Sequence, residues 1–200
     1  MSLLILCVLG YLIGSIPTGF LLIKHFKGID LRNFGSNSTG ATNVLRAGDK
    51  KLAFLTLFCD ALKGIIFTVF IKYVFPDSIN LISVFCCILG HTYPIWLKFK
   101  GGKGVATSAG IFLVLSPLYG FISIIIWALV AKVLKISSIA SLVLSISFVT
   151  LCFYGILFSD TQFDVFAFSI LCFVFLVCTH LSNIKRLFNK DESQTTLNKI

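Results

Sequence analysis

Long apolar runs constrain this sequence more than any other feature. A helix needs about 20 apolar residues to cross the hydrocarbon core of a bilayer, and each run comes close to that length. Only 12% of the 200 residues are charged, whereas soluble domains contain about 25%. Because lipid offers no water to backbone groups, the sequence predicts an all-α integral membrane protein. The apolar segments are residues 3–23, 52–75, 79–97, 105–131, 136–158 and 163–182.

The residues between these segments indicate how the helices are oriented. Lys and Arg gather in residues 24–51, in residues 98–104 and in the tail after residue 182. The connections 73–80 and 159–164 contain Asp but neither Lys nor Arg. Since basic loops stay in the cytoplasm, we expect the N-terminus outside and the C-terminus in the cytoplasm.

The segment 105–131 conflicts with this orientation if it crosses the membrane only once. A single crossing would place Lys132 and Lys135 outside. Two short crossings of about 13–15 residues, bent near Ser116–Pro117, would remove the conflict. We therefore expect about seven transmembrane helices, some of them short.

Composition also limits the domains, cofactors and partners. We expect one membrane domain over residues 1–188 and a short polar cytoplasmic tail over residues 189–200. The net charge of +9 comes without a basic patch interleaved with aromatic residues, so we expect no nucleic acid as a partner. The charge suits anionic lipids and phosphorylated substrates instead. The seven Cys lie in apolar runs without zinc-site spacing, and we expect no metal and no cofactor.

A first polar string, residues 29–46, is rich in Gly, Ser, Thr and Asn. Small residues let the backbone approach a ligand closely, and successive amides and hydroxyls can surround phosphate oxygens. An Arg can hold a phosphate through two parallel hydrogen bonds. The alternative is an ordinary polar loop held by its own Asn and Ser side chains. The candidate site residues are Gly35, Ser36, Gly40, Thr42, Asn43 and Arg46.

A second string, residues 90–107, places glycines around a lysine just before an apolar helix. A Gly-rich turn that enters a helix N-terminus is suited to bind an anion, although the spacing here is not that of a Walker A loop. A flexible turn with positive-inside lysines is the alternative. The candidate residues are His91, Gly101, Gly102, Lys103 and Gly104.

A third string, residues 180–186, closes the last apolar segment. His180 and Asn183 are three residues apart and share one helical face, where they could bind a polar head or orient a reactant. A His that interacts with a helix dipole is the alternative. Inside the segment 52–75, Asp60 and Lys63 carry costly charges, and we expect them to form a structural ion pair.

Together the three strings resemble the PlsY family, bacterial membrane enzymes that acylate glycerol 3-phosphate with acyl phosphate. The resemblance spans about residues 10–188 in the same order. Where the family often has Gly-Asn-Pro, this chain has Asn37, Ser38 and Thr39. The matching pieces are Gly35-Ser36, GATNVLR (40–46), Gly90-His91, KGGKGVAT (100–107), His180 and NIKRL (183–187).

The resemblance implies a bacterial inner-membrane enzyme whose active site faces the cytoplasm. The sn-1 hydroxyl of glycerol 3-phosphate would attack the acyl-phosphate carbonyl, giving lysophosphatidic acid and phosphate in the first acylation step of phospholipid synthesis. Acyl phosphate is already activated, so the protein must mainly position two anions and stabilise developing charge. Membrane lipid and a soluble enzyme that produces acyl phosphate are the further partners implied.

The resemblance also implies roles for the candidate residues. Arg46 and Lys103 would hold substrate phosphates, and His91 would support the site or take part in proton transfer. His180 and Asn183 would hold glycerol 3-phosphate. The catalytic set is Ser36, Arg46, Lys103, His180 and Asn183, and the substrate-binding set is Gly35, Gly40, Thr42, Asn43, His91, Gly101, Gly102 and Gly104.

Two other functions share some of these features. A membrane transporter of a phosphorylated metabolite would also place Arg and Lys beside Gly-rich breaks, but transporters usually bind at the midplane between repeated helices. A non-catalytic membrane protein that recruits a soluble lipid-synthesis enzyme would need only a basic surface. Acyl transfer without a soluble partner distinguishes the enzyme from both.

Overall fold

The computed structural model describes residues 2–75, 80–159 and 161–189, and within these ranges it contains helices and no strands. The described residues form two compact units, 2–111 and 112–189, and each is described by itself. The first contains α1 (Leu3–Gly14), α2 (Thr18–Lys27), η1 (Leu31–Asn33), α3 (Ala41–Arg46), α4 (Lys50–Val74), α5 (Leu81–Thr92), η2 (Ile95–Leu97) and the start of α6 (Val105–Leu115). The second contains α7 (Pro117–Leu134), α8 (Ser137–Phe158), α9 (Phe163–Thr179) and α10 (Leu181–Phe188).

The helices follow the predicted apolar segments. Within the part of the chain that the structure describes, four stretches are long and apolar enough to cross a membrane, and α9 with α10 is a fifth that bends by 57°. The helices α5 and α6 are apolar but shorter. Seven crossings and the orientation of the termini therefore stay predictions. Two acidic residues used for the orientation, Asp77 and Asp160, lie outside the described residues, as does the tail from residue 190.

The break near Ser116–Pro117 is confirmed, but the two helices beside it are unequal. The helix α6 has 11 residues and α7 has 18, instead of about 13–15 each. Ser116 has an extended φ of −146°, and Pro117 occupies the first turn of α7, where its missing N–H is not needed. The helix α7 continues past residue 131, so that Lys132 lies in its last turn and Lys135 ends it at a φ of 55°.

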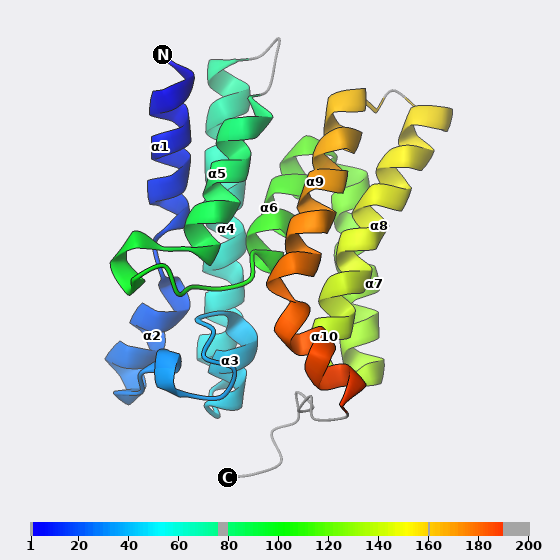
Figure 1. The fold of residues 1–200 in the computed structure, drawn as a ribbon. Coiled ribbons are helices and arrows are strands. Elements are labelled where there is room, and N and C mark those ends of the chain that lie inside the picture. Colours follow the sequence, from blue (N-terminus) through cyan, green and yellow to red (C-terminus); the bar gives the residue numbers. More distant parts are fainter. Residues whose placement is uncertain (1, 76–79, 160, 190–200) are drawn as a thin grey trace. The chain divides into compact units, whose positions relative to one another are not determined.

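Small residues let the helices of the first unit pack closely. A side chain on Gly14 would overlap the backbone of Cys87 in α5, and one on Gly90 would overlap the backbone of Tyr11 in α1. The helices α4 and α6 meet in the same way at Gly64 and Gly110. Figure 1 shows α1, α4 and α5 side by side, with α2 and α3 at the end of this unit away from the N-terminus. Such small-residue contacts are typical of helices that pack within a membrane.

The second unit is held together mainly by aromatic and aliphatic side chains. The helix α8 packs against both α7 and α9. The ring of Phe112 stacks on that of Phe148 with centroids 4.1 Å apart and also contacts Phe168 at 5.8 Å. The bend after α9 then starts α10, which carries Lys185 and Arg186 in its last turn.

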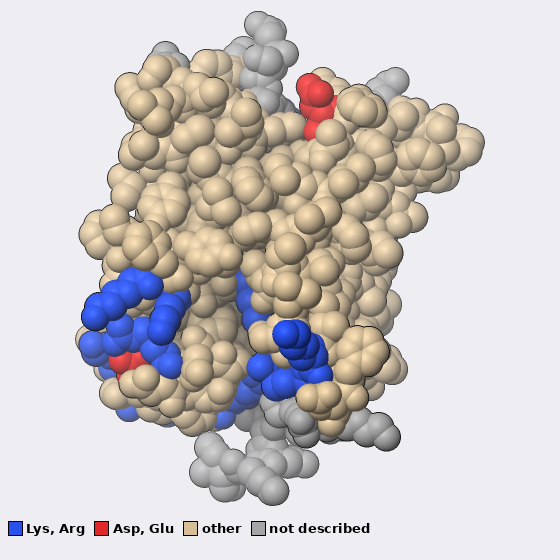
Figure 2. Space-filling model, in the orientation of Figure 1, with Lys and Arg blue, Asp and Glu red and all other residues tan. Residues whose placement is uncertain are grey.

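Charge separates the polar ends of the units from their apolar surfaces. Figure 2 shows Lys and Arg gathered at the lower part of the view, while the broad surface above them contains none. On α4, Phe54, Phe58 and Ile66 are more than half exposed. Large apolar side chains that are exposed along a helix are what a lipid-facing surface requires.

Candidate active site

The first polar string folds around the side chain of Asn43. Its Nδ2 group donates to the carbonyl oxygens of Phe34 and Ser38, both at 2.8 Å, and of Leu31 at 3.3 Å. Its Oδ1 accepts a hydrogen bond from the backbone N–H of Ser36 at 3.1 Å. Because Asn43 is only 1% exposed, one buried amide determines the path of the loop at residues 31–46, which we call the Asn43 loop.

Two left-handed residues complete the turn of the Asn43 loop. Gly35 has a φ of 57° and Asn37 a φ of 56°. A side chain on Gly35 would overlap Oδ1 of Asn43 and would lie 3.7 Å from Cδ of Arg46. Gly is therefore required at position 35 both for its backbone angle and for the space beside Asn43. The loop leads into α3, whose last residue is Arg46.

The second polar string turns back on the end of α5. The N–H groups of Gly101 and Gly102 donate to the carbonyl oxygens of Thr92 and His91, at 3.0 and 3.1 Å. Lys98 and Phe99 both have positive φ and reverse the chain direction before this contact. Residues 101–104, which we call the glycine loop, then lead into α6 at Gly104, whose φ is 88°.

One backbone hydrogen bond joins the two loops. The N–H of Thr39 in the Asn43 loop donates to the carbonyl oxygen of Gly101 at 3.3 Å. Arg46 of the Asn43 loop and Lys103 of the glycine loop are both partly exposed. The first unit thus assembles small residues, backbone amides and two cations into one region, which suits the binding of an anionic group.

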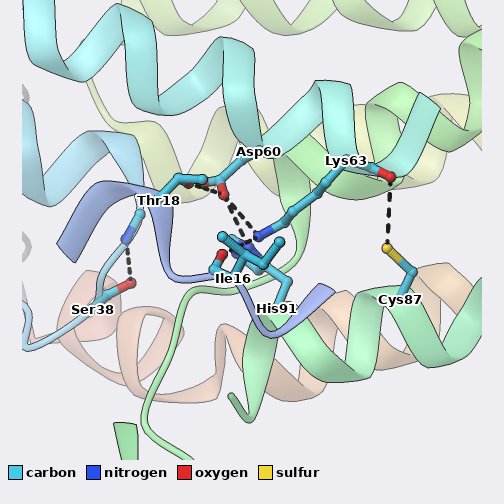
Figure 3. A network of polar contacts seen from close by, with 8 residues as sticks. Ile16, Thr18, Ser38, Asp60, Lys63, Cys87 and His91 are labelled. Carbon is cyan, nitrogen blue, oxygen red and sulfur yellow. Dashed lines mark hydrogen bonds and ion pairs between the residues drawn. The ribbon is translucent and has the colours of Figure 1, made fainter. Parts of the chain in front are cut away.

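A buried cluster of charged and polar groups lies beside these loops (Figure 3). Asp60 accepts a hydrogen bond from Thr18 at 2.6 Å and pairs with Lys63 at 2.9 Å through the same oxygen, Oδ1. Nδ1 of His91 lies 3.4 Å from that oxygen. The predicted ion pair between Asp60 and Lys63 is therefore confirmed, and His91 joins it from a different helix.

The second unit carries the remaining two candidates. His180 stands between α9 and α10, and its Nδ1 lies 2.8 Å from the carbonyl oxygen of Leu176. Because a carbonyl only accepts hydrogen bonds, Nδ1 is the donor in this contact. Asn183 follows in α10. Both side chains are buried, His180 at 2% exposed and Asn183 at 3% exposed.

A partly exposed ion pair lies where the chain enters the Asn43 loop. The side chain of Asp30 accepts hydrogen bonds from Nε of Arg32 at 3.0 Å and from Nη2 at 2.6 Å. The hydrogen-bonded guanidinium of Arg32 lowers the pKa of Asp30 from 3.8 to about 2. Asp30 also accepts from the backbone N–H of Arg32 and so starts η1.

Comparison with known proteins identifies the family to which these loops belong. The family model described as glycerol-3-phosphate acyltransferase matches residues 4–190. The chain belongs to this family. A glycerol-3-phosphate acyltransferase of Pelagibacter ubique (strain HTCC1062) is 43% identical over 197 residues, which cover 98% of this chain and 100% of the relative. One of Ruthia magnifica subsp. Calyptogena magnifica is 45% identical over 192 residues, covering 96% and 95%.

Comparison with solved structures gives the same family for this glycerol-3-phosphate acyltransferase. A crystal structure of PlsY (YgiH), an integral membrane glycerol 3-phosphate acyltransferase, matches in its glycerol 3-phosphate form with a TM-score of 0.88 and 36% identity. The match covers 96% of this chain and 94% of that chain. The lysophosphatidic acid form matches with a TM-score of 0.85 and 33% identity. The predicted family, the integral membrane fold and the enzymatic nature of the chain are confirmed.

The structure adds residues to the candidate site that the motifs did not indicate. Thr39 links the two loops, and Thr18 holds Asp60, although neither belongs to the candidate sets. A hydroxyl residue beside the Pro17 break and an intramembrane Asp were the available signals for Thr18 and Asp60. Among the candidates, Asn43 uses its amide within its own loop, while the catalytic and binding roles of the candidate residues stay predictions.

Proposed function

We propose that this enzyme transfers an acyl group from acyl phosphate to the sn-1 hydroxyl of glycerol 3-phosphate. The products are lysophosphatidic acid and inorganic phosphate, in the first acylation step of phospholipid synthesis. The reaction takes place at the cytoplasmic face of a bacterial inner membrane, where the basic loops lie under the positive-inside rule. A soluble enzyme that makes acyl phosphate supplies the donor.

The observation that carries this proposal is the contact between the Asn43 loop and the glycine loop. The bond from Thr39 to Gly101 brings together two segments that each contain backbone amides, small residues and at least one cation. A phosphate group that is also an acyl leaving group needs such an environment, because negative charge develops on it as the bond breaks. The apolar helices beside the loops suit the acyl chain.

The ligand states of the related crystal structures support glycerol 3-phosphate as the acceptor. Those structures are described as the glycerol 3-phosphate form and the lysophosphatidic acid form of an integral membrane glycerol 3-phosphate acyltransferase. The two molecules differ by one acyl group, so they are the acceptor and the product of the proposed reaction. In this proposal Arg46 and Lys103 bind phosphate groups, and His180 and Asn183 bind the acceptor.

The proposed reaction needs no covalent enzyme intermediate. The sn-1 oxygen forms a bond to the carbonyl carbon, and the bond between that carbon and the phosphate oxygen breaks. The hydroxyl proton ends on the released phosphate. Backbone N–H groups and Ser36 stabilise the negative charge that develops on the carbonyl oxygen.

The test uses the purified protein in detergent with palmitoyl phosphate and glycerol 3-phosphate. We expect lysophosphatidic acid and phosphate to form in equal amounts, without any soluble partner protein. Palmitoyl-CoA in place of palmitoyl phosphate should give no product. A folded preparation that makes product only from palmitoyl-CoA would refute the proposed donor, and one that makes no product from either would refute the reaction.

A further inference from the structure

The buried cluster around Asp60 is larger than an ion pair needs to be. Asp60, Lys63 and His91 are 3%, 6% and 7% exposed, and they come from two helices, α4 and α5. Lys63 also donates to the carbonyl oxygen of Ile16 at 3.2 Å, and Thr18 donates to Asp60. Burying charged groups within a membrane segment costs free energy, so such groups usually have a function.

The cluster holds the chain where α1 ends and α2 begins. Ile16 and Thr18 flank Pro17 in this break, and α4 supplies a partner to each of them. A break between helices leaves backbone groups without helical partners. The ammonium group of Lys63 provides a hydrogen bond to one of these groups, the carbonyl oxygen of Ile16, in an otherwise apolar environment. Gly19, which follows Thr18, packs so closely that a side chain there would overlap the carbonyl oxygen of Thr39 in the Asn43 loop.

The cluster also reaches the glycine loop, through His91. One edge of the imidazole ring, Nδ1, faces Asp60. The opposite edge faces Gly102, since a side chain on Gly102 would overlap Nε2 and the adjacent ring carbons. The carbonyl oxygen of His91 accepts the hydrogen bond from Gly102, so both the ring and the backbone of His91 contact the residue before Lys103.

These contacts connect the carboxylate of Asp60 to both the glycine loop and the Asn43 loop. We propose that Asp60 is a positioning residue, which through His91 fixes the glycine loop and through Thr18 fixes the α1–α2 break beneath the Asn43 loop. Its function is to set the place of the acyl-phosphate group, while it does not touch substrate itself. This inference rests on the function proposed above.

The physical consequence of losing the carboxylate follows from the same distances. Without the charge on Asp60, the ammonium group of Lys63 is buried 2.9 Å from a neutral atom, and the His91 ring loses the partner that holds its orientation. A tilt of that ring moves Gly102, against which it packs, and with it the neighbouring Lys103. Displacements of about 1 Å at a reacting group can lower rates about 100-fold.

The experiment measures kcat and both KM values in full-length enzyme carrying Asp60→Asn, His91→Phe or Thr18→Val. His91→Phe keeps a ring of similar size against Gly102 but removes the contact with Asp60. Thr18→Val keeps the shape of the side chain and removes only the donated hydrogen bond. We expect the KM for palmitoyl phosphate to rise about tenfold in the first two variants and about threefold in the third. The KM for glycerol 3-phosphate should stay within about twofold in all three.

A matched control is available on the same helix. Thr68 is fully buried in α4 and donates to the carbonyl oxygen of Gly64 at 2.7 Å, away from the loops. Thr68→Val removes the same kind of hydrogen bond as Thr18→Val and should leave both KM values within about twofold of wild type.

Three results would overturn the inference while leaving the proposed function intact. These are unchanged KM values in the variants, equal increases in both KM values, and a lower amount of active enzyme with normal KM values. If Asp60→Asn and His91→Phe do not fold, Thr18→Val alone decides between these results. An inactive wild-type enzyme would instead refute the proposed reaction.

Discussion

The amide of Asn43 offers the sharpest test of how the Asn43 loop keeps its shape. Asn43→Asp preserves the shape and size of the side chain but replaces the donor Nδ2 by an acceptor. Two hydrogen bonds of 2.8 Å, to the carbonyl oxygens of Phe34 and Ser38, are lost together. The new oxygen then faces those carbonyl oxygens in a site that is 1% exposed.

The magnitude follows from these contacts. Each lost hydrogen bond is worth about 1 kcal/mol net, and leaving buried acceptors without a donor costs about 1–3 kcal/mol more. The sum, about 3–5 kcal/mol, acts on the ordering of the loop. At 1.4 kcal/mol per factor of ten, kcat/KM should fall about 100-fold to 4,000-fold. The assay is the release of phosphate from palmitoyl phosphate in the presence of glycerol 3-phosphate.

Asn33→Asp is the matched control for this prediction. Asn33 lies in the same loop and is exposed, so the substitution adds the same charge without removing a buried donor. We expect kcat/KM of Asn33→Asp within about threefold of wild type. If Asn43→Asp retains kcat/KM within about threefold while the protein elutes as a folded monodisperse species, the amide does not hold the loop.

Three further predictions concern single contacts. Gly102→Ala would place a methyl group against the ring of His91, so kcat/KM should fall at least about tenfold with the protein still folded; full activity would contradict the packing. Arg46→Lys keeps the charge but loses the two parallel hydrogen bonds, so kcat/KM should fall about tenfold, and recovery to wild-type values would show that charge alone suffices. Because Arg32 lowers the pKa of Asp30 from 3.8 to about 2, the ionised carboxylate stabilises the fold above about pH 4 and this contribution is lost as the pH falls through about 2. The melting temperature of Asp30→Asn should therefore fall less over that range than that of wild type, and equal slopes would contradict the assignment.

Local signals in the sequence predicted the helices well. Apolar runs locate every long helix, and Pro117 marks the break between α6 and α7 because a proline is tolerated at the first turn of a helix but not in its interior. The ion pair of Asp60 and Lys63 was also predictable, since residues three apart face each other on a helix. In each case the signal lies within a few residues of the feature.

Contacts between distant segments could not be predicted in the same way. Nothing in the spacing of Asp60 and His91 indicates that they meet, because their contact depends on how α4 packs against α5. The sequence also did not indicate that the amide of Asn43 points into its own loop. Its sequence neighbours suggested a residue that lines a ligand site, whereas three carbonyl oxygens of the loop already occupy its donors.

The bond between Thr39 and Gly101 makes the backbone N–H at position 39 part of the contact between the two loops. A proline at position 39 would have no N–H to donate to Gly101. A proline also restricts the unfolded chain and so preorganises a turn through entropy. Here a hydrogen bond stands in place of that restriction. The two loops of this chain are therefore joined by a hydrogen bond, without a restricted backbone at position 39.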